Sequence, residues 1–542
     1  MSNPSETVSP SSDNPFYPYP WTGWSLLVCF LVTVFRLAYL AWLCPYNLAQ
    51  DEAHYWDWSR HLDWSYYSKG PLVAWLIALS NAMVGPIAPF LECDPALRVR
   101  LLAPFFGGGF LLGLFFFTRQ TIGSGKLAFG AMLTALTLPP VAVAGLLMTI
   151  DAPYTCCWVW ALVFAHQALL EGKTSSWILL GVAVGIGILA KYTMVLFIPS
   201  LFLAMIVDPL WRRKLLSPAP WVGILMVGIC CAPILIWNIK NDFVTLRHVG
   251  NLAGVDRASS GVRWMGPLAF LGGQMALLLG FWFVAWCVAM VRINPWRETD
   301  PGKRLAWWLS APTFVVFGMF SLKTGGGEVN WPVTAYLAGV PLVLSWVMGD
   351  LKAQRASYAP WVPLALGGGA LIVVLLHASP VVQPLLAGIM PVPNDGNPTP
   401  IRRIDPTCRL LGWRELTKVI DEIREKNPGI VLAAHRWSSV GLIGFYCSGQ
   451  PQVECLGAAL GDRHSQYDLW PNPVKSPGTF LGKDFVIVDA LPDSLKNAFT
   501  TVELPTQITG HGPTGVPVAR WSVVVARGFK GFDNSKLPNR GW

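Results

Sequence analysis

Long apolar runs recur along the first two thirds of the chain and then stop. They begin near Trp24, end near His377, and approach the roughly twenty residues that a helix needs to cross a bilayer. The pattern predicts an α-helical polytopic membrane protein. We count eleven predicted spans, at residues 22–43, 98–117, 127–147, 152–170, 176–190, 192–207, 219–238, 265–290, 304–322, 331–348 and 360–377.

The fifth and sixth predicted spans form one continuous apolar stretch, residues 176–207. A single helix of that length would measure about 48 Å at about 1.5 Å per residue, whereas a bilayer core is about 30 Å thick. Lys191 lies in the middle of the stretch. We therefore expect two shorter helices that meet at this lysine.

The hydrophobic pattern divides the chain into three parts. Residues 1–20 are rich in Ser and Pro and predict a disordered tail, and residues 21–378 predict a transmembrane domain whose first extracytoplasmic loop spans 44–97. Residues 379–542 predict a soluble extracytoplasmic domain with a small α/β fold. Its strand-like runs lie at 430–434, 452–456, 484–490 and 519–528, and its helical patterns lie near 412–426 and 438–447. Cys447 and Cys455 are candidates for a disulfide in this domain.

Composition and charge agree with this division. The chain is 53% hydrophobic and 13% charged, well below the charged fraction of a soluble domain. With the N-terminus in the cytoplasm, the loops on that side carry more Lys and Arg than Asp and Glu, as the positive-inside rule requires. The net charge of +9 comes from residues scattered between spans, which argues against nucleic-acid binding.

The stretch "NLAQDEAHYWDWSRHLDWSYYSKGPLVAWL", residues 47–76, gathers charge and aromatic rings directly after a predicted span. At 100° per residue, Asp51, Tyr55 and Trp58 fall on one side of a helix, which predicts an interfacial helix with its rings at headgroup depth. Asp51 and Glu52 begin this helix. They either cap it or form a polar reaction site together with Lys69.

Other charged residues are predicted on the same side of the membrane. Lys69 either extends to the headgroups or binds an anion, and Asp151 either caps the next helix or takes part in chemistry. Lys191 lies between two apolar helices, where a charge needs water, a partner or a ligand such as a lipid phosphate. Arg247 and Lys323 complete the predicted set of cations.

His54, Asp57 and His61 fall on one side of the predicted interfacial helix. This spacing is compatible with a metal site and equally with solvated side chains at an interface. The chain contains no Asp-x-Asp, the carboxylate pair with which many soluble glycosyltransferases hold the metal of a nucleotide-sugar. A nucleotide-linked donor is therefore disfavoured.

Four stretches together resemble glycosyltransferase family 39: "QDEAHYWDWSRHLDWSYYSKGPLVAWLIAL", "MTIDAPYTCCWVWAL", "GIGILAKYTMVLFIPSL" and "GEVNWPVTAYLAG". This family comprises the dolichyl-phosphate-mannose protein mannosyltransferases and the bacterial aminoarabinose transferases of lipid A. "RLLGWREL" and "SQYDLWPNP" look like the C-terminal part of its bacterial branch. The resemblance implies the type C membrane glycosyltransferase fold and location in a bacterial inner membrane, with the N-terminus cytoplasmic and the C-terminal domain periplasmic.

The resemblance also implies an activity. A polyprenyl-phosphate-linked sugar would be transferred, with inversion, to a hydroxyl of an extracytoplasmic lipid, glycan or protein. Asp51 matches the family's catalytic carboxylate and would be the general base, with Glu52 or Asp151 orienting the acceptor or the base. Lys69 matches the lysine of a Lys-Pro-Pro motif, although its first proline is Gly70 here. The cations that would stabilise the departing phosphate are Lys69, Lys191, Arg247 and Lys323.

No cofactor is firmly implied by this mechanism, and a divalent metal is compatible with it but not required. The partners implied are the polyprenyl-phosphate sugar, membrane lipids and the acceptor. The main alternative function is a transporter or flippase of a lipid-linked sugar, which would also need an anion site near the interface. A transporter would also be expected to have charges that are reachable from both faces of the membrane, whereas the candidate charged residues of this chain gather on one predicted side.

Overall fold

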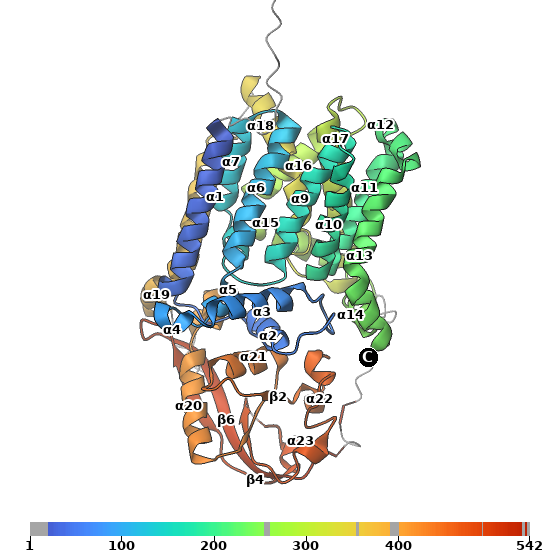
Figure 1. The fold of residues 1–542 in the computed structure, drawn as a ribbon. Helices are drawn as coiled ribbons and strands as arrows, with labels where there is room; N and C mark the ends of the chain where they lie inside the picture. Colours follow the sequence, from blue (N-terminus) through green and yellow to red (C-terminus); the bar gives the residue numbers. More distant parts are fainter. Residues whose placement is uncertain are drawn as a thin grey trace, which may run out of the picture.

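The computed structural model describes residues 20–253, 261–353, 357–390, 400–489, 491–533 and 537–538. The predicted N-terminal tail lies outside these residues except for Pro20. A helical bundle forms one half of the molecule and a domain with a β-sheet forms the other (Figure 1). Short helices of the first loop lie between the two halves: α2 (Gln50–Ser59), α3 (Leu72–Val84), α4 (Ala88–Leu91) and α5 (Leu97–Arg100).

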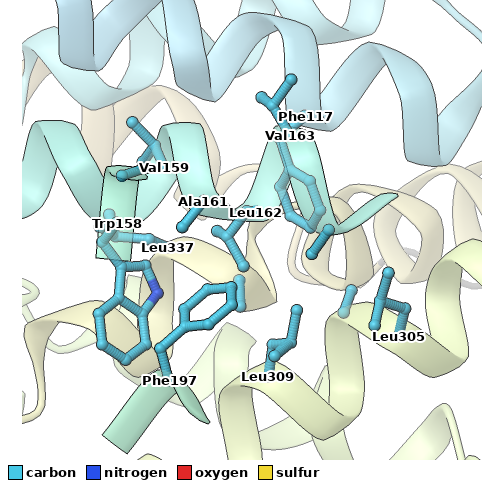
Figure 2. Packing of buried hydrophobic residues seen from close by; sticks show 14 of the residues in the cluster. Phe117, Trp158, Val159, Ala161, Leu162, Val163, Phe197, Leu305, Leu309 and Leu337 are labelled. Atoms are coloured by element: carbon cyan, nitrogen blue, oxygen red, sulfur yellow. The ribbon is translucent and has the colours of Figure 1, made fainter. Parts of the chain in front are cut away.

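Mostly long helices, joined by a few short ones, form the bundle, and α9 lies at its centre. Trp158 and Leu162 of α9 pack among Phe117, Phe197 and Leu337, which come from three other helices (Figure 2). The helices are α1 (Pro20–Ala38), α6 (Ala103–Ile122), α7 (Gly125–Leu136), α8 (Pro139–Ala144), α9 (Asp151–Leu169), α10 (Ser175–Ala190), α11 (Phe197–Val207), α12 (Pro209–Arg212), α13 (Pro218–Lys240), α14 (Val244–Ala253), α15 (Gly266–Leu277), α16 (Phe281–Arg292), α17 (Pro301–Thr324), α18 (Val333–Lys352) and α19 (Trp361–Ile389).

The prediction of a multi-pass membrane protein is confirmed, but the number of eleven spans is not. Among the described residues, 6 helices are long and apolar enough to cross a membrane, or up to 8 if each bent pair counts as one span. The predicted break at Lys191 is present, because α10 ends at Ala190 and Lys191 has an extended backbone with φ −145° and ψ 122°. A 3₁₀ turn, Tyr192–Leu196, follows it.

The structure corrects two of the predicted spans. Residues 265–290 do not form one helix, since α15 and α16 meet at 113° and the left-handed backbone of Leu279 and Gly280 lies at the bend. Residues 127–147 are interrupted where Pro139 and Pro140 begin the short helix α8, because proline has no N–H to continue the hydrogen bonds of α7. The chain after α8 then runs as a loop toward α2.

The prediction that the aromatic helix α2 lies among lipid headgroups is also wrong. Tyr55, Trp56 and Trp58 are buried inside the protein and do not sit in lipid headgroups. Helix α21 (Trp437–Tyr446) of the C-terminal domain packs directly on α2. A Cβ at Gly441 of α21 would lie 2.4 Å from the carbonyl oxygen of Ala53, so only glycine allows the two helices to approach this closely.

The C-terminal domain has the predicted α/β character. Its sheet has the order β2-β1-β3-β6-β4, with β5 also paired to β6; β1 runs parallel to β2 and β3, whereas β6 is antiparallel to its neighbours. The elements are α20 (Trp413–Lys426), β1 (Val431–Ala434), α21, β2 (Val453–Cys455), α22 (Gly457–Leu460), β3 (Phe485–Val488), α23 (Asp493–Lys496), β4 (Phe499–Val502), β5 (Thr506–His511) and β6 (Pro517–Phe529).

One prediction about this domain, the disulfide, is wrong, and another, the position of its boundary, is not tested by the structure. Cys447 and Cys455 do not form the suggested disulfide; both thiols are free and buried in an apolar cluster, where they behave as small hydrophobic side chains. Helix α19 continues to Ile389 with a kink at Ala378. The proposed domain boundary at residue 378 stays a prediction.

Candidate active site

A polar cavity of about 570 Å³ lies between the helical bundle and the C-terminal domain. We call its charged residues from the bundle and first loop the cavity floor, and the residues that follow α19 the cavity roof. The floor contains Asp51, Lys69, Asp151, Lys191 and Glu328, and the roof contains Arg409, Trp437, Arg463 and His464. The structure therefore brings together five of the residues that the sequence singled out, because His54 also lines this cavity, and it adds partners that the sequence did not indicate.

Asp51 is the second residue of α2, and its side chain is exposed to the cavity. Within the described part of the chain, its carboxylate makes no hydrogen bond or ion pair. Burial by the surrounding protein raises its pKa above the ordinary value, and the nearby acid Asp151 adds to this effect, whereas Lys69 and Arg463 oppose it. Asp51 is thus a free carboxylate with an increased affinity for a proton.

The neighbouring acid, Glu52, is held inside the protein and does not line the polar cavity. Arg100 donates hydrogen bonds to it from Nε at 2.9 Å and from Nη2 at 2.7 Å. The carboxylate also accepts the backbone N–H of Ala49 at 2.8 Å and of Met148 at 2.9 Å. Both Glu52 and Arg100 are buried, so Glu52 joins the start of α2 to the loop after α8 and thereby fixes the position of Asp51.

Sequence reasoning missed Arg100. Its guanidinium also donates to the carbonyl oxygens of Tyr46 and Asn47 before α2. The available signal was its position at the start of a predicted span, because a charged residue beside an apolar run needs a partner. The sequence does not show that this partner is Glu52.

Asp151 and Lys191, the first residue of α9 and the residue after α10, form an ion pair on the floor with an Oδ1–Nζ distance of 2.7 Å. The other carboxylate oxygen, Oδ2, accepts a hydrogen bond from Asn330 Nδ2 at 3.0 Å, and the Lys191 ammonium lies 5.2 Å from the ring of Tyr154. We call this contact the floor ion pair. Lys191 is therefore already neutralised, and Asp151 is not a free base.

Lys69 remains unpaired in the part of the chain that the structure describes. Its ammonium lines the cavity, and burial lowers its pKa, as does Lys191, whereas Asp51 raises it. Gly70 explains how Lys69 is placed: a Cβ at that position would lie 2.1 Å from the carbonyl oxygen of Leu189. Glycine in place of the family's proline lets the loop rest on the end of α10.

Arg247 and Lys323 do not reach the cavity, contrary to expectation. Both side chains are exposed, and neither lines the cavity. Arg247 is followed in α14 by His248, which does line it, because adjacent residues of a helix point about 100° apart. Burial, Lys69 and Arg463 lower the pKa of His248 to about 4, so this side chain is neutral near pH 7.

The three metal-site candidates are not gathered around a common point. No group of three or more His, Cys, Asp or Glu side chains that could hold a metal occurs among the described residues. His61 packs against the ring of Trp470, and Asp57 pairs with Arg60 at 3.4 Å. His54 is buried among aromatic rings, and burial lowers its pKa to about 3.

The cavity roof was not found from the sequence. Arg463 lies over the ring of Trp437, with its guanidinium carbon 4.7 Å from the ring centroid. Arg409 comes from the 3₁₀ turn Pro406–Leu410 after α19. Neither arginine has a hydrogen bond or ion pair from its guanidinium within the described residues. Arg463 lies in a polar segment without a motif, and Arg409 begins the stretch "RLLGWREL", in which no pattern connected it to Asp51.

A second, mostly apolar cavity of about 360 Å³ opens beside the polar one. It is lined by residues of α8, the following loop and α19, among them Leu146, Leu147 and Leu376. We call it the apolar groove. Gln50, Asp51 and Arg409 line both cavities. Asp51 therefore lies where a space suited to a lipid chain meets a space suited to a polar group.

Comparisons with known proteins agree with this architecture. A family model described as dolichyl-phosphate-mannose-protein mannosyltransferase matches residues 68–237. The crystal structure of ArnT from Cupriavidus metallidurans bound to undecaprenyl phosphate aligns with a TM-score of 0.57 at 15% sequence identity, covering 93% of this chain and 98% of that chain.

Two curated relatives come from Rhizobium johnstonii. Lipid A galacturonosyltransferase RgtD is 27% identical over 299 residues, which cover 55% of this chain and 60% of that protein. Lipopolysaccharide core galacturonosyltransferase RgtA is 27% identical over 237 residues, 42% of this chain and 44% of that protein. The matches thus span about half of each relative. The predicted resemblance to family 39 and the type C glycosyltransferase fold are confirmed.

Proposed function

We propose that this chain, which resembles the membrane mannosyltransferases of family 39 and has the type C fold, transfers a sugar from a polyprenyl-phosphate-linked donor to an acceptor hydroxyl. The ArnT structure was determined with undecaprenyl phosphate, and both curated relatives are named as galacturonosyltransferases. These names support a lipid-linked donor, a hexosyl group and a glycolipid or glycan acceptor.

The position of Asp51 carries the proposal. It is the free carboxylate where the polar cavity meets the apolar groove, while Glu52 is held by Arg100 and Asp151 by Lys191. A general base must reach the acceptor hydroxyl and must not already be neutralised by a fixed cation. Asp51 meets both conditions, and its raised pKa makes it a stronger base than an ordinary aspartate.

The transfer proceeds in one displacement. The acceptor oxygen attacks the anomeric carbon while its proton passes to the carboxylate of Asp51. The bond between the anomeric carbon and the phosphate oxygen breaks, and the polyprenyl phosphate leaves with that electron pair. Because the acceptor and the phosphate lie on opposite faces of the anomeric carbon, the configuration inverts.

Lys69 is the residue best placed to stabilise the departing phosphate. Among the described residues it is the unpaired cation of the cavity floor, and a fixed ammonium stabilises negative charge that develops during the reaction. The floor ion pair instead holds α9 and the end of α10 together beneath the sugar. Glu52 and Arg100 position α2 and therefore act on Asp51 without touching substrate.

The two sides of Asp51 suit the two lipid substrates. The loop of Lys69 packs on α10, whereas the apolar groove lies against α8 and α19, and α10 and α19 are on different sides of the bundle in Figure 1. We assign the groove to the apolar part of a lipid acceptor and the side of Lys69 to the donor phosphate. This arrangement separates nucleophile and leaving group as inversion requires.

The cavity would face the periplasm from a bacterial inner membrane. The loops predicted to be cytoplasmic, such as that of α12, lie at the end of the bundle opposite the C-terminal domain (Figure 1). Their excess of Lys and Arg supports a cytoplasmic location for that end.

Replacing Asp51 tests the proposal. Purified protein in proteoliposomes would receive radiolabelled undecaprenyl-phosphate hexose and a bacterial lipopolysaccharide extract, and labelled glycolipid would be measured. Asp51→Asn should lower transfer by about 10³-fold, within the range of general-base catalysis. The matched control Glu328→Gln removes the other free carboxylate of the floor and should keep most of the activity. No step above needs a metal, so activity should survive EDTA.

Two results would contradict the proposal. Full activity of a folded Asp51→Asn variant would remove this residue from the mechanism. Movement of the labelled lipid between leaflets without a covalent product would favour the alternative of a flippase.

A further inference from the structure

The charges that line the polar cavity are not balanced. The floor ion pair is neutral, which leaves two unpaired acids and three unpaired cations among the described residues. The acids are Asp51 and Glu328, and the cations are Lys69, Arg409 and Arg463. When Asp51 acts as a base it takes up a proton, so the excess of positive charge increases during the reaction. The cavity is thus suited to substrates with more than one negative group.

The phosphate of the donor is only one of the negative groups that such a cavity could bind. In the proposed function, on which this inference rests, Lys69 faces that phosphate. Arg409 lies at the junction with the apolar groove, beside the acceptor. Arg463, also on the roof, is the remaining unpaired cation among the described residues, and the donor phosphate and the acceptor leave it without an anion.

The geometry of Arg463 suits a carboxylate. Its guanidinium lies over the ring of Trp437 at 4.7 Å, which fixes the guanidinium while leaving N–H donors free at its edge. Trp437 is itself supported by His54, with ring centroids 4.9 Å apart. A planar guanidinium with free N–H groups can bind both oxygens of a carboxylate.

Arg463 also faces the reacting groups. It lines the same cavity as Asp51 and Lys69, and its charge lowers the pKa of both. A sugar whose anomeric carbon lies between Asp51 and Lys69 would therefore turn another edge of its ring toward the roof.

We propose that Arg463 selects the transferred sugar by binding the carboxylate of a uronic acid, the class of sugar that the names of both curated relatives contain. The phosphate then meets Lys69 on the floor, and the carboxylate meets Arg463 on the roof. A neutral hexose, with a hydroxymethyl group in place of the carboxylate, would leave the guanidinium without its anion. Arg463 would thus determine which sugar the enzyme accepts.

Donor binding tests the proposal without an acceptor. The affinities of undecaprenyl-phosphate galacturonic acid and undecaprenyl-phosphate galactose would be compared by titration of the full-length protein in detergent. The wild type should bind the acidic donor about 10- to 100-fold more tightly, the range of a charged hydrogen-bonded contact. Arg463→Gln should remove this preference by weakening only the acidic donor, and Arg463→Lys should keep part of it. Arg436→Gln, a nearby arginine outside the cavity lining, should behave as wild type.

Other results would overturn the assignment of Arg463 or the proposed function itself. Equal affinity of the wild type for both donors, or an unchanged preference in a folded Arg463→Gln variant, would overturn the assignment while leaving Asp51-dependent transfer intact. Equal weakening of both donors by Arg463→Gln would show that Arg463 binds the phosphate. Failure of the folded wild type to bind either donor would overturn the proposed function as well.

Discussion

The cavity floor and the cavity roof differ in how many of their charges are paired. On the floor and directly behind it, most charges are paired: Asp151 holds Lys191, and Glu52 holds Arg100. On the roof, the guanidinium groups of Arg409 and Arg463 have no acidic partner within the described residues. The floor therefore combines fixed ion pairs with the unpaired Asp51, Lys69 and Glu328, whereas the described charges of the roof are unpaired arginines.

This difference separates two tasks. Paired and buried groups hold the backbone in place, so changing one of them disturbs the fold as well as the chemistry. Unpaired groups at a cavity surface can change without that penalty, and their identity selects the ligand. The floor is therefore suited to carrying out the transfer, and the roof is suited to selecting the sugar or the acceptor.

The largest effect is expected when the buried pair behind Asp51 is broken. Glu52→Gln or Arg100→Gln leaves a charge buried without its partner, which costs roughly 3–5 kcal/mol of folding free energy. Thermal unfolding in detergent should show a strongly lowered midpoint for each variant. Glu328→Gln, which removes an unpaired and exposed floor carboxylate, should unfold as the wild type does.

A double variant refines this prediction. Glu52→Leu with Arg100→Met removes both charges and should recover much of the lost stability. If the single variants were as stable as the wild type, the view that the floor is fixed by this pair would be wrong.

The second effect concerns the unpaired floor cation. Lys69→Met should lower kcat/KM by about 10²-fold, because the leaving phosphate loses a preorganised charge. It should also change the pH profile: Lys69 lowers the pKa of Asp51, so its removal raises that pKa. The base must be deprotonated to act, and the acidic limb of the profile should therefore shift to higher pH.

A matched substitution checks the cause. Lys69→Arg retains the positive charge and should keep the acidic limb near its wild-type position. An unchanged limb in Lys69→Met would mean that the observed base is not coupled to Lys69.

The floor could largely be predicted from the sequence, and the reasons are physical. Asp51, Lys69, Asp151 and Lys191 each stand beside an apolar run, where a charge requires an explanation. The pattern did not distinguish burial in lipid from burial in protein, so Trp58 was assigned to headgroups although α2 is covered by α21. Both environments favour the same aromatic side chains.

The roof could not be predicted because its parts come from distant segments without periodicity. Arg463 lies in a polar loop after α22, and only the fold of the sheet domain brings it over Asp51. The strands β4 and β5 were missed for a related reason: "FTTV" and "TQITGH" bury few of their side chains and show little apolar alternation.

The contact between floor and roof gives the third prediction. Gly441→Ala places a Cβ 2.4 Å from the carbonyl oxygen of Ala53 and must push α21 away from α2. We expect a loss of roughly 1–3 kcal/mol in stability, the usual effect of overpacking, together with lower activity. Gly478→Ala in the same domain is the control, since its Cβ would meet no atom within 4 Å. Equal stability of the two variants would show that the roof is not docked through this glycine.

The smallest effect should come from the two expected cations that the structure leaves outside the cavity. Arg247 and Lys323 have exposed side chains and line neither the polar cavity nor the apolar groove. Exposed charges at such positions are screened by water and salt, so Arg247→Gln and Lys323→Gln should change kcat/KM by about twofold or less. The comparison with Lys69→Met, measured under the same conditions, isolates the effect of facing the cavity. A loss above tenfold in either variant would mean that α14 or the end of α17 moves toward the donor during the reaction, because only a direct contact with the phosphate would give an exposed cation such an effect.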